Sequence, residues 1–394
     1  MLDLVEFNND PVLARDTLLA RLKAAATATE RAGLHYRLWE MCQACGEETE
    51  ALRHLDIAVQ LDPVQLPSTP ESSSRMRLVV LNVLGTFQAN APIAMLLDEA
   101  VAIYTVWISG KRHQRESLVQ AVKNLNPDAV ILAMGEDERQ LPAILEADAI
   151  ARSSGAPVLN NAAQIIGLTR SGVPDLLKGI AKVIVPACKE VCVPFENLPA
   201  FPLLVRPVSS HAGHDLAKVD DREAFNHYIQ THDSQLDYYV TQFVNYMGVD
   251  GLYRKYRVVF IDGVPYPVHL AIHEDWAIWY YNAKMENFPE RRAEEARFLA
   301  DMKSYFPLSV MNGLSAIAER VGLEYFGLDF GVLQDGSLLL FEVETAMIVH
   351  DRDPEDVFPY KKVCIARIRH AFEAMIEARG QRMWKATSAI LHSD

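Results

Sequence analysis

Three acidic residues in the C-terminal part of the chain have the spacing of a metal site. The segment GLDFGVLQDGSLLLFEVET spans residues 327–345, and an Asp-Gly turn separates Asp329 on one expected strand from Glu342 and Glu344 on the next. Residues two apart on a strand share one sheet face, and Asp329 can point to that face across the hairpin. Carboxylates that converge repel one another unless a cation lies between them, and Mg²⁺ prefers such oxygen ligands. The spacing therefore predicts a Mg²⁺ site, the alternative being a strand face whose acids are solvated.

The opposite face of this hairpin is expected to be apolar. It would be formed by Leu328, Phe330, Phe341 and Val343. Because every neighbour of the acids is hydrophobic, the pattern favours metal binding over a merely solvated strand face.

An aspartate on one strand followed by Glu-x-Asn, or a close variant, on the next resembles the metal site of ATP-grasp enzymes. This superfamily includes D-alanine–D-alanine ligase, glutathione synthetase and the RimK-type ligases. The resemblance implies that Asp329, Glu342 and Glu344 hold Mg²⁺ against the phosphates of ATP. The last position is commonly Asn in the family and is Glu344 here, which leaves the coordination of the transferred phosphate open.

Earlier motifs follow in the order that the family requires. The segment PLLVRPVSSHAG at 202–213 places Arg206 where the family has a lysine that touches the phosphates, and an arginine can bind phosphate through two parallel N–H groups. The loop that would close over the phosphates then contributes hydroxyls and bare backbone at Ser209, Ser210 and Gly213. Arg170, in NAAQIIGLTRSGV, matches the family's other phosphate-contacting lysine.

Two further segments resemble parts of the family's nucleotide site. YYVTQFVNY at 238–246 matches the hinge whose backbone binds adenine, the alternative being an ordinary core strand. Its binding positions would be Gln242, Phe243 and Val244. Arg257, which follows Arg254 and Lys255, matches a basic residue that faces the phosphates or the acyl intermediate, and His269 could point to the same site from the neighbouring strand or be structural.

The resemblance implies an ADP-forming carboxylate–amine ligase with ATP and Mg²⁺ as cofactors. A small-molecule or peptide carboxylate would be activated as an acyl phosphate and then attacked by an amine. Arg257 and His269 would be the catalytic side chains. Two alternatives stay open: a kinase that phosphorylates a small molecule, and a nucleotide-binding scaffold. Many relatives are dimers, so a homodimer is an open expectation.

Three segments must position these residues, and they differ in pattern. Residues 1–66 are expected to be a small all-α domain, because residues 11–63 are rich in helix formers and residues 32–63 resemble one tetratricopeptide repeat. Residues 77–165 are expected to form a Rossmann-like pre-ATP-grasp domain. Residues 166–385 are expected to form the ATP-grasp domain, after a Pro- and Ser-rich linker at 64–74. The fold class is therefore α/β and α+β.

The Rossmann-like segment alternates continuous apolar strands with helices, which indicates a parallel sheet. Strands are expected at 78–84, 101–108, 129–133 and 156–160, and helices at 92–100, 115–125 and 141–152. No GxGxxG follows the first strand, so the sequence does not predict NAD binding. In the last segment strands are expected at 182–186, 202–205, 238–244, 257–261, 265–272, 325–333 and 338–343, and helices at 290–302, 309–321 and 359–379.

Composition excludes some classes of partner. The chain has 394 residues, and its 52 acidic residues outnumber the 38 basic ones, for a formal charge of −14. Nucleic acids and anionic membrane surfaces require the opposite sign. Five cysteines suggest no disulfide framework, the first residues lack the basic part of a signal peptide, and no apolar run approaches a membrane span. We expect a soluble, cytoplasmic protein that binds neither nucleic acid nor membrane.

Overall fold

The computed structural model describes residues 10–67, 74–110, 115–192, 195, 197–208, 213, 215–232, 236–279 and 282–391, with only the backbone for residues 381–391. Ser209 and Ser210 lie outside the described residues. Three sheets with helices around them form the architecture, which confirms the mixed α/β and α+β fold class.

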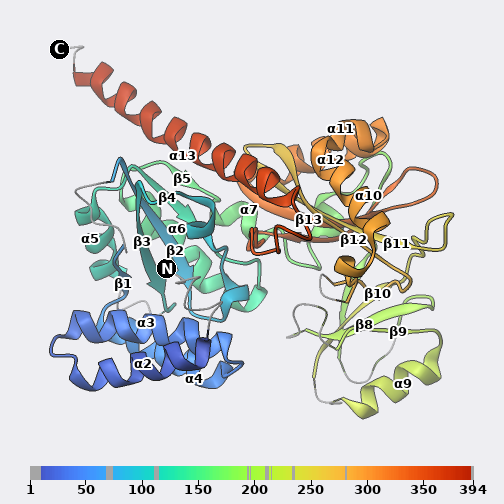
Figure 1. Ribbon diagram of the computed structural model, residues 1–394, viewed down its shortest axis with the longest axis horizontal. Helices are drawn as coiled ribbons and strands as arrows, with labels where there is room; N and C mark the ends of the chain where they lie inside the picture. Colours follow the sequence, from blue (N-terminus) through green and yellow to red (C-terminus); the bar gives the residue numbers. More distant parts are fainter. Residues whose placement is uncertain are drawn as a thin grey trace.

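The N-terminal residues form three helices: α2 (Pro11–Ala24), α3 (Ala28–Ala44) and α4 (Glu48–Leu61). Asp10 and Thr27 cap α2 and α3 by accepting hydrogen bonds from Leu13 N and Glu30 N. The expectation of a helical N-terminus is confirmed, and the tetratricopeptide interpretation stays a prediction. The helices lie at one end of the first sheet (Figure 1), where Trp39 packs edge-on against Trp107 with ring centroids 5.1 Å apart.

The first sheet has the order β1-β3-β2-β4-β5, and all of its strands are parallel except β1. Its strands are β1 (Val64–Gln65), β2 (Met76–Val83), β3 (Val101–Ile108), β4 (Ala129–Leu132) and β5 (Val158–Leu159). The helices of this part are α5 (Arg115–Leu125), α6 (Leu141–Ser153), α7 (Ala162–Ile166) and α8 (Val173–Leu176), with 3-10 helices η2 (Phe87–Ala89), η3 (Ile93–Leu96) and η5 (Glu138–Gln140). The parallel arrangement expected from the sequence is confirmed.

The helix expected at 92–100 is wrong. Only η3 forms there, because hydrogen bonds at both ends of the segment compete with a longer helix. Ala91 N donates to Ala133 O at 2.6 Å, and the Asp98 side chain accepts from Ala100 N at 2.9 Å. Asp in this role favours a turn over continued helix.

The second sheet is antiparallel, with the order β7-β10-β8-β9. Its strands are β7 (Cys188–Val191), β8 (Leu203–Pro207), β9 (Ala217–Val219) and β10 (Tyr238–Gln242). Helix α9 (Arg222–Thr231) covers one face and buries Phe225 against Val205 and Tyr238.

The third sheet has the order β12-β11-β13-β14-β6, with only β6 parallel to its neighbour. Its strands are β6 (Val183–Ile184), β11 (Tyr253–Ile261), β12 (Val264–His273), β13 (Tyr325–Val332) and β14 (Leu338–Glu344). Its helices are α10 (Pro289–Ala300), α11 (Met302–Tyr305), α12 (Leu308–Val321) and α13 (Lys361–Leu391), with η6 (Met285–Asn287).

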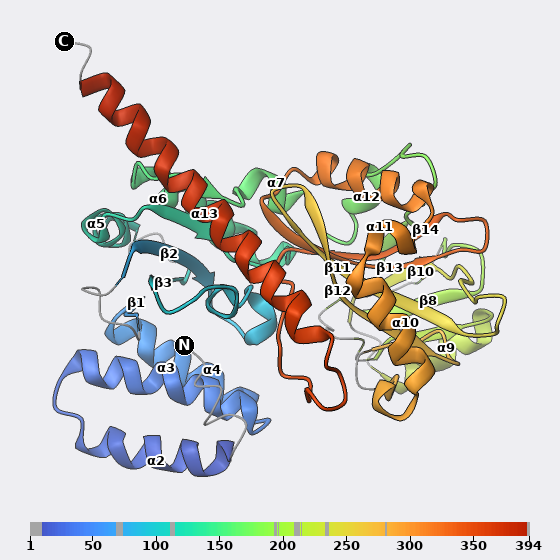
Figure 2. The ribbon, with the colours of Figure 1, turned by 45° about the horizontal axis from the view of Figure 1, so that its top comes forward.

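Helix α13 connects the third sheet to the first. It starts beside the third sheet, where Phe372 packs edge-on against Tyr325 of β13 with ring centroids 5.3 Å apart, and crosses over the first part of the molecule (Figure 2). Arg369 Nε also donates to Met95 O at 2.9 Å. The domain boundaries at 66, 77 and 165 stay a prediction. In the described part of the chain, no helix is long and apolar enough to cross a membrane.

Candidate functional site

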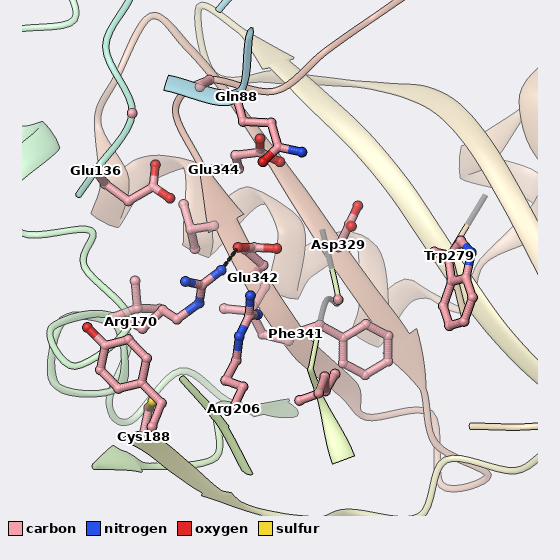
Figure 3. Close-up of a pocket in the computed structure, with 18 of the residues that line it drawn as sticks. Gln88, Glu136, Arg170, Cys188, Arg206, Trp279, Asp329, Phe341, Glu342 and Glu344 are labelled. Atoms are coloured by element: carbon pink, nitrogen blue, oxygen red, sulfur yellow. Dashed lines mark hydrogen bonds and ion pairs between the residues drawn. The ribbon is translucent and has the colours of Figure 1, made fainter. Parts of the chain in front are cut away.

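A cavity of about 1510 Å³ lies where the three sheets meet. Every sequence-predicted site residue that the structure describes lines it. These residues are Arg170, Arg206, Gly213, Gln242, Phe243, Val244, Arg257, His269, Asp329, Glu342 and Glu344. Figure 3 shows several of them pointing into the same space from different segments of the chain.

The acidic hairpin β13–β14 contains a bulge that changes which side chains face the cavity. Asp329 pairs with Glu342 and Gly327 with Glu344, but the register shifts after Asp329 so that Phe330 pairs with Leu340. The extra residue is Phe341. A bulge turns one side chain to the other face, and Phe341 is 39% exposed and lies on the cavity side (Figure 3). The expectation that Phe341 belongs to the apolar opposite face is therefore wrong, whereas Leu328, Phe330 and Val343 are buried as expected.

Asp329 is held by two cations. It is 1% exposed, and Arg257 donates from Nε to Oδ1 at 2.7 Å and from Nη2 to Oδ2 at 2.8 Å. Lys255 Nζ lies 2.7 Å from Oδ2. Burial alone would raise the pKa of Asp329, but the charges of Arg257 and Lys255 hold it far below its usual range. Asp329 is therefore an ionised carboxylate.

Lys255 is a site residue that the sequence reasoning did not select. Lys255 and Arg257 are two apart on β11, so both reach the cavity. Arg254, one residue before Lys255, pairs instead with Asp250 at 2.7 Å and Glu294 at 2.6 Å. The period of two along the strand was the signal that could have identified Lys255.

Two arginines surround Glu342. Arg170 Nη2 lies 2.5 Å from Glu342 Oε1, and Figure 3 shows Arg206 directing its guanidinium toward the same carboxylate. Burial and the charge of Arg170 lower the pKa of Arg206 to about 10. Two arginines that repel each other in one cavity form a site that an anion would stabilise.

Glu344 lies among other carboxylates. Its pKa is raised to about 8 by burial, against the opposing charge of Arg257, and further by the charges of Glu342 and Glu136. Glu136 follows β4 and accepts hydrogen bonds from Thr345 N and Thr345 Oγ1, both at 2.9 Å. Sequence reasoning missed Glu136, although it lies just beyond the carboxyl end of a parallel strand, where α/β sheets bind ligands.

The donor chemistry of this cluster fits Mg²⁺ at two of the three predicted positions. Glu342 and Glu344 share a face with Glu136 nearby, and the charges of Glu342 and Glu136 add to the burial that raises the pKa of Glu344; a divalent cation would relieve this repulsion. Both oxygens of Asp329 are already bound by Arg257 and Lys255. As the described side chains stand, no three His, Cys, Asp or Glu residues are close enough to hold a metal ion. The metal role stays a prediction.

The expected adenine hinge follows β10 at the cavity edge. Gln242 is the last residue of β10, and Phe243 N donates to Pro202 O at 3.0 Å. The Phe243 ring packs edge-on against Trp276 with centroids 5.6 Å apart. The exposed ring of Phe341 packs against that of Tyr246, with ring centroids 4.9 Å apart. Aromatic surface thus flanks the hinge.

His269 lies opposite Arg257 in the β11–β12 register and is 9% exposed. Burial lowers its pKa well below the ordinary value, and the charges of Arg257 and Lys361 lower it further. The imidazole is therefore neutral. Lys361, the first residue of α13, also lines the cavity and pairs with Glu295 at 3.3 Å and Asp353 at 3.1 Å.

The N-terminal helices contribute Glu48 of α4 to the cavity wall and also contact the loop after β2 that lines it. Gly85, Thr86, Gln88 and Ala89 line the cavity. Trp39 Nε1 donates to Gly85 O at 3.0 Å, and Gln43 Oε1 accepts from Phe87 N at 2.7 Å. Helix α3 therefore holds this loop from outside, a relationship that no motif in the sequence predicted.

Comparison with known proteins found similarity only at the level of structure. No protein-family model matches the chain, and no curated protein matches it by sequence. The structure is similar to a D-alanine–D-alanine ligase from Bacillus anthracis, with 17% identity, a TM-score of 0.46, and 79% of this chain and 99% of that chain covered. It is also similar to a RimK domain protein, described as ATP-grasp, from Sphaerobacter thermophilus, with 14% identity, a TM-score of 0.44, and 76% and 99% covered. The structure is similar as well to an L-amino acid ligase from Bacillus licheniformis, with 13% identity and a TM-score of 0.42. The matched part covers 68% of this chain and 66% of that chain.

Proposed function

We propose that this chain is an ATP-dependent carboxylate–amine ligase that releases ADP and phosphate. The observation that carries this proposal is the charge arrangement of the cavity. Its lining includes the cationic side chains Arg170, Arg206, Lys255 and Arg257 together with the carboxylates of Glu136, Asp329, Glu342 and Glu344. A nucleoside triphosphate with a divalent cation is complementary to both sets.

The nucleotide would lie with its phosphates toward the arginines and its base toward the hinge. The backbone of residues 242–244 would bind the adenine edge, and the exposed ring of Phe341 would give the base an apolar surface to pack on. Arg170, Arg206 and Arg257 would contact phosphate oxygens. The role of the loop that contains Ser209, Ser210 and Gly213 in closing over the phosphates is part of this proposal.

The reaction would proceed in two displacements. An oxygen of the substrate carboxylate attacks the γ-phosphorus, so that an O–P bond forms, the bond to ADP breaks and an acyl phosphate results. The amine then attacks the acyl carbon, a C–N bond forms, phosphate leaves, and the amine loses a proton. Mg²⁺, held by Glu342 and Glu344, would neutralise charge on the phosphates. Arg257, oriented by Asp329, would stabilise the negative charge that develops on the transferred group.

His269 and Glu136 would support the reaction through hydrogen bonds. Neutral His269 can donate or accept a hydrogen bond without adding charge beside Arg257. Glu136 would position Thr345, and with it Glu344, through its two hydrogen bonds.

Thermal stability with and without Mg-ATP tests the nucleotide part of the proposal. Mg-ATP at about 100 times its dissociation constant should stabilise the wild type by roughly 2.7 kcal/mol. The Glu342→Gln, Glu344→Gln double variant should show no such gain. Release of ADP and phosphate in equal amounts, over pools of acids and amines, tests the ligase reaction. ADP without phosphate would indicate a kinase, and no stabilisation of the wild type would contradict the proposal.

A further inference from the structure

Two carboxylates of the cavity, Glu342 and Asp329, are paired with cations in this structure. Arg170 is paired with Glu342, and both Arg257 and Lys255 are paired with Asp329. The proposed function assigns Arg170 to phosphate and Glu342 to Mg²⁺. Ligand binding therefore requires an exchange of partners at this pair, in which phosphate takes the place of Glu342 at Arg170.

The exchange is unfavourable when no metal accompanies the nucleotide. If a metal-free triphosphate took Arg170, Glu342 would lose the cation that is 2.5 Å from it and would face an anionic phosphate instead. A charge that loses its partner in a partly buried site is strongly destabilised. Arg206 would not replace Arg170 as the partner of Glu342. It lies on the same side of the cavity as Arg170 and would also be drawn to the phosphates.

Resting on the proposed function, we infer that the Arg170–Glu342 ion pair makes the cavity selective for metal-complexed over metal-free nucleoside triphosphate. A divalent cation replaces Arg170 as the partner of Glu342, and this releases Arg170 to bind phosphate. Metal-free ATP supplies no such replacement, so Glu342 competes with it for Arg170. Glu342 is thus a residue that determines specificity, in addition to its proposed role as a metal ligand.

The substitution Glu342→Gln tests this inference in a binding experiment that requires no acid or amine substrate. It keeps the size of the side chain and removes its charge. Calorimetry would give the dissociation constants of ATP in EDTA and of ATP with Mg²⁺, for the wild type and for E342Q. In EDTA the variant should bind ATP about tenfold more tightly than the wild type, within the usual range of coupling between sites. With Mg²⁺ it should bind ATP more weakly than the wild type does.

Asp335→Asn is the matched control. Asp335 lies in the turn of the same hairpin, outside the cavity lining, and pairs with Lys182 at 3.0 Å. D335N changes the formal charge of −14 by the same one unit as E342Q. Both of its dissociation constants should equal those of the wild type within about twofold, because an exposed pair contributes little.

Two more variants show whether the effect acts through the ion pair. Arg170→Gln should weaken ATP binding with and without Mg²⁺. In the R170Q/E342Q double variant, the loss of Glu342 should no longer improve metal-free binding. Glu342→Ala repeats the comparison if E342Q does not fold.

The outcomes separate the inference from the proposed function. If the wild type binds Mg-ATP but E342Q binds metal-free ATP no better than the wild type, the inference is wrong and the proposed function stands. If D335N binds metal-free ATP more tightly by the same factor as E342Q does, the inference is also wrong, because the cause would then be the net charge of the protein. If the wild type binds ATP in neither condition, both the proposed function and the inference are wrong.

Discussion

Arg257 and Asp329 lie opposite each other on β11 and β13 and share two parallel hydrogen bonds. The planar guanidinium and the carboxylate fit each other in this geometry, which fixes the Arg257 side chain in one orientation. Because Asp329 is almost fully buried, the pair also affects the stability of the third sheet. The same two residues thus orient a proposed catalytic group and hold two strands together.

We expect Arg257→Met to destabilise the protein. The substitution removes one of the two cations that pair with the buried Asp329 carboxylate and leaves Lys255 in place. Removing one partner of a buried ion pair costs about 3 kcal/mol or more. Urea unfolding would measure the loss. Lys182→Met, which breaks the exposed pair with Asp335, is the control and should change the unfolding free energy by about 0.5 kcal/mol or less. Equal losses in the two variants would contradict this expectation.

We expect Phe341→Ala to weaken Mg-ATP binding about tenfold. The bulge in β14 exposes this ring to the cavity, and losing an aromatic contact costs roughly 1.4 kcal/mol, which corresponds to that factor. Calorimetric titration would measure the dissociation constant. Leu308→Ala, at an exposed position at the start of α12, is the control and should leave it unchanged. An unchanged affinity in Phe341→Ala would place the base elsewhere.

We expect Gln43→Ala to loosen the loop at residues 85–89 without changing Mg-ATP affinity. The side chain accepts the hydrogen bond from Phe87 N, and its loss costs about 1 kcal/mol. Hydrogen exchange of the Phe87 amide should become faster, because its acceptor is removed. Trp39→Phe, which removes the hydrogen bond to Gly85 O, should have a similar effect. Unchanged exchange in both variants would show that α3 does not hold the loop.

We expect His54→Gln to reduce the loss of stability in acid. His54 and His35 are buried with their Nδ1 atoms 2.8 Å apart. Burial, and then the charges of Arg53 and His35, lower the pKa of His54 to about 4. Below the unfolded value of about 6.5, the unfolded chain binds a proton that the folded chain does not. Stability at this site is therefore lost as the pH falls from about 6.5 to about 4.

Urea unfolding at several pH values across that window would measure the effect. As the pH falls through that window, the free energy of unfolding of the wild type should decrease by about 1 to 3 kcal/mol more than that of His54→Gln, because glutamine does not titrate. His227→Gln, at an exposed position on α9, is the control and should follow the wild type. Parallel profiles for the wild type and His54→Gln would contradict the expectation.

Several elements could be predicted because their signals are local. Residues 101–108 and 115–125 form the strand and the helix that periodicity predicts, within the same boundaries. The short charged strand β7 and helix α9 were not predicted. The sequence CKEV of β7 has no apolar run, and it forms a strand because it pairs with β10. Pairing of this kind is a tertiary interaction, and the strand propensity of the four residues does not predict it.

The sequence by itself determined that three carboxylates share a hairpin and that basic residues precede them, because side-chain alternation along a strand is a local property. Only the tertiary structure decided which of them face each other. It placed Arg257 and Lys255 on Asp329, Arg170 on Glu342, and Glu136 beside Thr345. It also turned Phe341 into the cavity through a bulge. These relationships join residues up to 209 positions apart in the chain, and they arise from strand register and domain packing rather than from any local pattern.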